Sequence, residues 1–137
     1  MRERHAMNDH ERGFLTFLAE PNRRRMATLL QLGEKRRRDA RTLLRSVQLD
    51  PQYSEHLKGS DAFSGTVEAI LHKSGASPTC FVFSTNSHLD GREMLLREAL
   101  EEIIGMGDAA FVSCIPGRLG FYEYDCMKSS YILSTPL

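Results

Sequence analysis

The chain has 137 residues, of which 41% are hydrophobic and 26% are charged, and these proportions are ordinary for a folded domain with one hydrophobic core. Its formal net charge is zero, so the chain as a whole has no bias toward nucleic acid or membrane surfaces. No apolar run approaches the roughly 18 residues needed to span a bilayer. Residues Met1 to His5 lead into no apolar segment of the signal-peptide kind, so we expect a cytoplasmic protein that does not bind membranes.

The first half of the chain is predicted to be helical. Residues 1–12 are polar and are expected to form a flexible arm, with a single domain over residues 13–137. Gly13 to Ala19 is predicted to form one or two helical turns. From Asn22 to Val47 apolar residues then recur at helical spacing, at Met26, Leu29, Leu30, Gly33, Ala40, Leu43, Leu44 and Val47.

Arg36 and Arg37 occupy the next two positions of that apolar stripe. Two interpretations follow from this interruption. Either one long helix leaves the core there and projects into solvent, or the helix breaks near Gly33 into two. Further helices are expected from Gln52 to Lys58 and from Ser64 to Lys73.

The second half of the chain changes to the pattern of a sheet. A continuous apolar run over Thr79 to Thr85 predicts a strand that is buried on both faces. Asp90 followed by Glu93 resembles a helix cap, and it predicts a helix that ends at Gly105. The remaining predicted elements are a strand over Ala109 to Ile115, a turn at Pro116 and Gly117, a hairpin partner over Leu119 to Tyr124, and a further strand over Ser130 to Ser134.

This order of elements predicts an α/β or α+β domain. An N-terminal helical layer would cover one face of a small mixed β-α-β-β(-β) sheet. The helix after the first strand implies one right-handed parallel crossover, followed by antiparallel additions.

The three cysteines and five histidines predict neither a metal site nor a cofactor. Cys80, Cys114 and Cys126 are odd in number and widely spaced, and the chain has no CxxC pair. Cys80 and Cys114 lie in apolar runs and are expected to be buried, whereas Cys126 lies in a polar turn and is expected to be exposed. The histidines show no spacing typical of metal ligands, and a catalytic triad would have to assemble from residues far apart in the sequence.

The neutral total charge hides an uneven distribution. Residues 21–47 carry nine basic residues against two acidic ones, a net charge of +7, whereas residues 48–137 carry a net charge of −6. This basic segment is a candidate surface for phosphates or for an acidic partner, through Arg23, Arg24, Lys35, Arg36, Arg37, Arg38, Arg41 and Arg45. The alternative is a solvated helix face, or a match to glutamates of the same chain or of a second copy, at Glu93, Glu98, Glu101 and Glu102.

The loop Ser84–Arg92 is the second candidate site. A loop from a strand end to a helix N-terminus is a common place for ligands, and His88, Asp90 and Arg92 would add a proton carrier, an acceptor and a guanidinium. The same residues also suit an ordinary turn with an N-cap, and the glycine spacing of a nucleotide-binding loop is absent from the sequence.

An aromatic surface is the third candidate. Alternation places Tyr122 and Tyr124 on one face of the predicted hairpin, opposite Phe121. At a sheet edge these tyrosines would form an exposed patch for a partner, and otherwise they would fill the core between sheet and helices.

The leading functional hypothesis is a small cytoplasmic interaction or regulatory module, not an enzyme. It would act through the arginine-rich helix and the aromatic sheet edge, with another protein or a second copy of the chain as its partner. The alternatives are a small-ligand-binding protein or small enzyme that uses the loop Ser84–Arg92, and a nucleic-acid-binding accessory protein.

Overall fold

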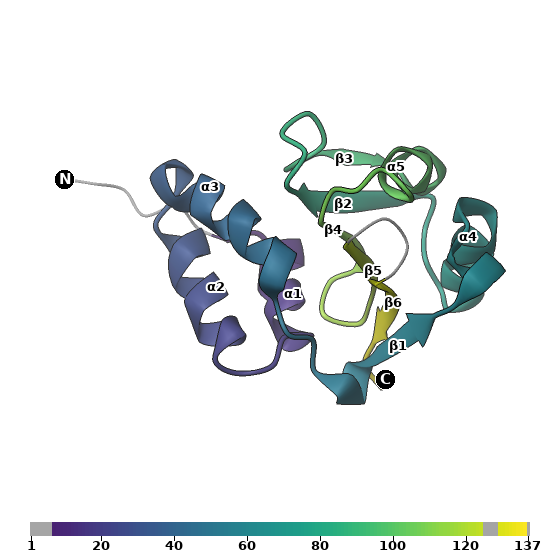
Figure 1. Ribbon diagram of the computed structural model, residues 1–137, viewed down its shortest axis with the longest axis horizontal. Helices are drawn as coiled ribbons and strands as arrows, with labels where there is room; N and C mark the ends of the chain where they lie inside the picture. The colour runs from purple at the N-terminus through teal and green to yellow at the C-terminus, as the bar shows by residue number, and fades with distance from the viewer. Residues whose placement is uncertain (1–6, 125–128, 137) are drawn as a thin grey trace.

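The computed structural model describes residues 7–124 and 129–136, without the side chains of Glu34, Lys35 and Ser60. Within these residues six strands form one open sheet in the order β1-β6-β5-β4-β2-β3, and every neighbouring pair is antiparallel (Figure 1). The strands are β1 (Ser54–Leu57), β2 (Thr79–Ser84), β3 (Glu93–Leu95), β4 (Ala110–Ile115), β5 (Leu119–Tyr124) and β6 (Ser129–Ser134).

Helices cover both faces of the sheet. Figure 1 shows α1 (Asp9–Thr16), α2 (Asn22–Gln31) and α3 (Glu34–Leu43) together on one side, as the predicted helical layer. Their core is aromatic, with Phe14 of α1 and the C-cap residue Phe17 packed against residues of β2, β4 and β5. On the other face α4 (Ser64–Lys73) and α5 (Leu96–Ile103) pack against a mainly aliphatic core. The strands alternate their side chains between these two cores, which confirms the predicted α/β class.

The basic segment forms two helices that break at Gly33. The backbone of Gly33 has φ 81°, a left-handed conformation that residues with a side chain rarely adopt. After this break α3 starts in a new direction, and its inward positions Arg37 and Ala40 are continued by Leu44 just after the helix ends. A 3₁₀ turn, η1 (Leu44–Ser46), follows α3 and leads into the extended segment from Val47.

The predicted helix over Asp90 to Gly105 was wrong in its first turns. The chain instead makes a tight hairpin in which Gly91 N–H donates to Val82 O and Val82 N–H donates to Arg92 O, both within 2.9 Å. Glu93 to Leu95 then pair with β2 as β3, and α5 begins only at Leu96. The connection Ser84–Arg92 is therefore a strand-to-strand loop, not a strand-to-helix loop.

The same hairpin overturns the predicted parallel crossover. From the end of β2 the chain runs back along β2 as β3, and α5 then returns it to the end of β2. β4 therefore begins beside the point where β2 ends, with Ser84 opposite Ala110. The two strands therefore run antiparallel.

Two shorter predictions also change. Gln52 to Lys58 is not a helix, because the 3₁₀ turn η2 (Pro51–Tyr53) leads directly into β1, which pairs with β6. Of the expected N-terminal arm, residues 1–6 lie outside the described residues, and α1 already begins at Asp9. Asn8 and Glu11 form a reciprocal capping box there, which accounts for this early start.

Candidate functional site

Arg37 of α3 is the centre of a buried ion-pair network. Its guanidinium donates to both carboxylate oxygens of Asp90, each at 3.0 Å, and also to the carboxylate of Glu11 on α1. The side chains of Arg37, Glu11 and Asp90 are 13%, 3% and 7% exposed. The guanidinium carbon also lies 4.6 Å from the centre of the Phe83 ring, within the range of a cation–π contact.

This network connects α1, α3 and the loop after β2. Asp90 also accepts a hydrogen bond from the Ser84 N–H at 3.0 Å, and Glu11 belongs to the cap of α1. Burial lowers the pKa of Arg37, but the hydrogen bonds and charges of Asp90 and Glu11 outweigh it, so the pKa lies above its ordinary value. Arg37 therefore holds elements of the fold together, and its guanidinium is not available to a partner.

The loop Ser84–Arg92 does not bring its three candidate residues together as a site. Asp90 is occupied by Arg37 and by the Ser84 N–H. His88 and Arg92 are exposed, and the Arg92 side chain makes only a long hydrogen bond to His88 O, at 3.4 Å, among the described residues. Because no helix starts at this loop, it offers no helix N-terminus to bind an anion.

The other basic candidates divide into paired and unpaired side chains. Arg23 donates to Leu15 O and Leu18 O at the end of α1. Arg24 lies 3.9 Å from Glu20, and Arg36 pairs with Asp39 at 3.1 Å. The side chain of Lys35 lies outside the described part of the structure.

Three arginines of α3 and η1 form what we call the arginine stripe, namely Arg38, Arg41 and Arg45. They are spaced at i, i+3 and i+7, so they lie along one side of the helix, next to the inward stripe that contains Arg37. Arg38 and Arg45 are exposed and Arg41 is half-buried. None of the three forms an ion pair or a hydrogen bond through its side chain to another described residue.

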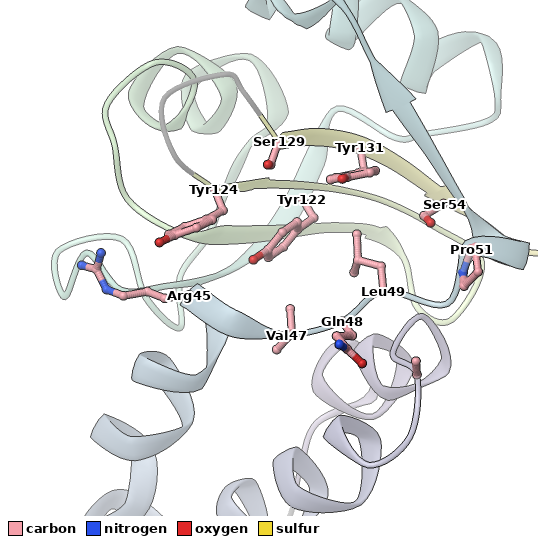
Figure 2. Close-up of a pocket in the computed structure, with 11 residues that line it drawn as sticks. Arg45, Val47, Gln48, Leu49, Pro51, Ser54, Tyr122, Tyr124, Ser129 and Tyr131 are labelled. Atoms are coloured by element: carbon pink, nitrogen blue, oxygen red, sulfur yellow. The ribbon is translucent and has the colours of Figure 1, made fainter.

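The arginine stripe ends at a groove between the sheet and the segment that follows α3. The groove has a volume of about 530 Å³, and we call it the tyrosine groove because three of the four tyrosines of the chain line it. Figure 2 shows Arg45 at its Tyr124 end and Pro51 at its opposite end. Its lining residues are Ala19, Arg45, Val47, Gln48, Leu49, Pro51, Ser54, Tyr122, Tyr124, Ser129 and Tyr131.

The two predicted surface tyrosines differ in their exposure. β5 lies inside the sheet and not at its edge, so Tyr122 is only 3% exposed, and its hydroxyl donates to Leu44 O. Burial also raises the pKa of Tyr122. Tyr124 and Tyr131 are half-buried, and their hydroxyls donate to no other described residue.

Sequence reasoning missed Tyr131 as part of this site. Tyr131 lies directly opposite Tyr122 in the pairing of β5 with β6, with ring centres 6.4 Å apart. Tyr131 belongs to the predicted strand over Ser130 to Ser134, but the sequence does not say which strand lies beside it. The segment Val47–Leu49 was also missed, since its role depends on where α3 ends.

A second, smaller cavity of about 190 Å³ lies near the start of β2. It is lined by His10, Ser77, Thr79, Cys80, Glu93 and Cys114. His10 Nδ1 is hydrogen-bonded to Ser113 Oγ at 2.7 Å, and its ring stacks on Phe81. Burial raises the pKa of the Cys80 thiol and of the Cys114 thiol to about 12, so both thiols are poor nucleophiles. The predicted exposed Cys126 lies outside the described residues.

The geometry of the described residues places no cluster of three or more His, Cys, Asp or Glu side chains for a metal ion. In the same residues no helix is both long enough and apolar enough to cross a membrane. The chain matches no protein-family model, no curated protein and no solved structure. The contacts described above are therefore the basis for a functional proposal.

Proposed function

We propose that the protein is a non-catalytic interaction module that binds a negatively charged partner along the arginine stripe and in the tyrosine groove. The observation that carries this proposal is a line of three arginines that ends at an open groove and pairs with no carboxylate among the described residues. Such a guanidinium can form a forked pair with a carboxylate or a phosphate of a partner. We expect the module to act in the cytoplasm, as the sequence suggested.

Three other arginines of the basic segment are bound within the fold. Arg23, Arg36 and Arg37 already bind groups of the same chain, so they contribute structure and not a free charge. An interaction module is also favoured over a small enzyme at the loop Ser84–Arg92, because Asp90 is bound between Arg37 and the Ser84 N–H.

The proposal is tested by binding to simple polyanions. The triple variant Arg38→Gln, Arg41→Gln and Arg45→Gln removes the charge of the stripe, and we expect it to elute from immobilised heparin at clearly lower salt than the unchanged protein. The matched control is the triple variant Arg92→Gln, Arg97→Gln and Arg118→Gln, which removes three exposed charges elsewhere. Equal elution of the two variants would show that the stripe is no binding surface.

A second copy of the chain is a possible acidic partner. Glu98, Glu101 and Glu102 are exposed on α5, and none of them forms an ion pair with another described residue. A contact between α5 of one copy and the stripe of the next gives a closed dimer where it is reciprocated across a two-fold axis, and rings or chains where it repeats head to tail. Light scattering at low and high salt detects such assemblies, because their size falls as salt screens the charges.

A further inference from the structure

We infer that the partner is single-stranded nucleic acid, with phosphates on the arginine stripe and an unstacked base in the tyrosine groove. This inference rests on the proposed function and names the chemistry of its partner. Two features on adjoining surfaces lead to it. One is a line of guanidiniums without a partner among the described residues, and the other is a groove lined by aromatic rings, and Arg45 belongs to both.

The stripe suits a phosphate backbone. From Arg38 to Arg45 the chain advances seven residues, which corresponds to about 10 Å along a helix at 1.5 Å per residue. Three guanidiniums over that length can contact successive phosphates of an extended strand. Because Arg45 is the last of the three and also lines the groove, a strand that follows the stripe arrives at the groove.

The groove suits a base. Figure 2 shows the rings of Tyr122 and Tyr124 projecting from the sheet toward the segment that carries Val47 and Leu49. The hydrogen bond of Tyr122 to Leu44 O holds one ring in place, while the hydroxyls of Tyr124 and Tyr131 in the same groove donate to no described residue. Aromatic rings beside a basic surface are the usual platform on which bases of single strands stack.

Two other anionic partners fit this surface less well. An acidic peptide would satisfy the arginines, but its carboxylates offer nothing that stacks in a groove lined by three tyrosines. A duplex offers phosphates, but its bases are paired and stacked inside the helix and do not reach the groove. A single strand supplies both phosphates and free bases.

Fluorescence anisotropy with a labelled oligonucleotide of about ten nucleotides tests the phosphate contacts, since single-strand sites span about 4–16 nucleotides. Three phosphate contacts predict that log K falls with log salt with a slope of about −2 between about 50 and 200 mM. The triple Gln variant of Arg38, Arg41 and Arg45 should lose most of this slope. The Arg92, Arg97 and Arg118 control should keep it.

The tyrosines test the base contact separately. The double variant Tyr124→Leu and Tyr131→Leu removes two rings, and we expect binding at least about tenfold weaker with an unchanged salt slope. The double variant Tyr124→Phe and Tyr131→Phe keeps the rings and should bind as the unchanged protein does. If the double Leu variant does not fold, the single variant Tyr124→Leu replaces it in the binding measurement, after thermal melting has shown that the single variant is folded.

The outcomes separate this inference from the function on which it rests. Binding of a glutamate-rich peptide that needs the stripe, without binding of the oligonucleotide, would overturn the inference and leave the proposed function standing. Equal affinity for the single strand and its duplex, or for a mononucleotide and the oligonucleotide, would also overturn it. If the unchanged protein bound no polyanion even at low salt, both the inference and the proposed function would be overturned.

Discussion

The two ends of α3 meet the same sheet in opposite ways. At its start, Arg37 is enclosed by Glu11, Asp90 and the ring of Phe83, and every charge has a partner. At its end, Arg45 has no partner among the described residues, and the space between η1 and the sheet stays open as the tyrosine groove. The sequence shows two similar arginines eight positions apart, but one is part of the core and the other is part of a surface.

This contrast shows what decides the role of a basic residue. Moving a guanidinium out of water is costly unless carboxylates surround it, and Glu11 and Asp90 supply them from two distant parts of the chain. Beside Arg45 the described residues that line the groove are tyrosines, apolar side chains and small polar groups, and none of them is a carboxylate. A charge there stays in contact with solvent and with whatever enters the groove.

The largest expected effect is on stability, from Arg37→Ala. This change leaves Glu11 and Asp90 buried without a cation, and we expect the free energy of unfolding to fall by about 3–5 kcal/mol. The neighbouring Arg38→Ala changes an exposed side chain and should stay within about 0.5 kcal/mol. Denaturant unfolding measures both, and similar losses for the two variants would contradict the division between the inward and the outward face of α3.

Tyr122 and Tyr124 extend the comparison to the floor of the groove. Tyr122→Phe removes the hydroxyl that donates to Leu44 O and leaves this buried carbonyl without its donor, so we expect a loss of about 1–2 kcal/mol. Tyr124→Phe removes a hydroxyl that makes no hydrogen bond to a described residue, and stability should not change measurably. If thermal melting showed equal losses, Tyr124 would be part of the core and not of an open groove.

Local patterns in the sequence predicted much of the fold. The helix over Ser64 to Lys73, the hairpin at Pro116 and Gly117, and the helical layer on one face depend on apolar period and turn chemistry, which are properties of neighbouring residues. The start of α5 depends instead on Asp90, whose carboxylate is held by Arg37 from 53 positions away. A capping pattern in the sequence does not reveal that a distant arginine binds the carboxylate that would otherwise cap the helix.

The candidate site was predictable only in part, for the same reason. The excess of arginine predicted a basic helix, but it did not separate Arg37 from Arg38, because burial depends on the elements that pack against α3. The two tyrosines of β5 were found by alternation, whereas their exposure depended on the order of strands. β6 pairs with β5 and makes it an inner strand, which buries Tyr122 and brings Tyr131 beside it.

Glu123 offers a contrast with Glu11 and Asp90, because it is fully buried with hydrogen-bond donors in place of a cation. Burial raises its pKa, and hydrogen bonds from the Gly105 N–H at 2.9 Å and the Ser130 hydroxyl at 3.0 Å partly oppose this shift. The folded protein therefore keeps this proton to higher pH than the unfolded chain. The stability that Glu123 contributes is present below the unfolded pKa of about 4.3 and is lost as the pH rises through the folded pKa.

Glu123→Gln should remove this pH dependence. The amide can keep both hydrogen bonds. At neutral pH we therefore expect the free energy of unfolding of the variant to equal that of the unchanged protein or to exceed it by up to about 1 kcal/mol. Unfolding measured from about pH 5 to about pH 8 gives the comparison. Glu102→Gln, at an exposed position of α5, is the matched control and should follow the unchanged protein. An identical pH slope in all three proteins would show that Glu123 does not titrate differently on folding.

The smallest expected change in stability comes from the stripe itself. Arg41 and Arg45 lie near the C-terminal end of α3, where a positive charge interacts favourably with the helix dipole by about 0.3–1 kcal/mol. The three like charges at i, i+3 and i+7 repel one another by about 0.2–0.5 kcal/mol for each pair. These contributions oppose each other, so the triple Gln variant should unfold within about 0.5 kcal/mol of the unchanged protein. A large loss would mean that the stripe stabilises the fold, and a weaker affinity for polyanions would then be no evidence of a binding surface.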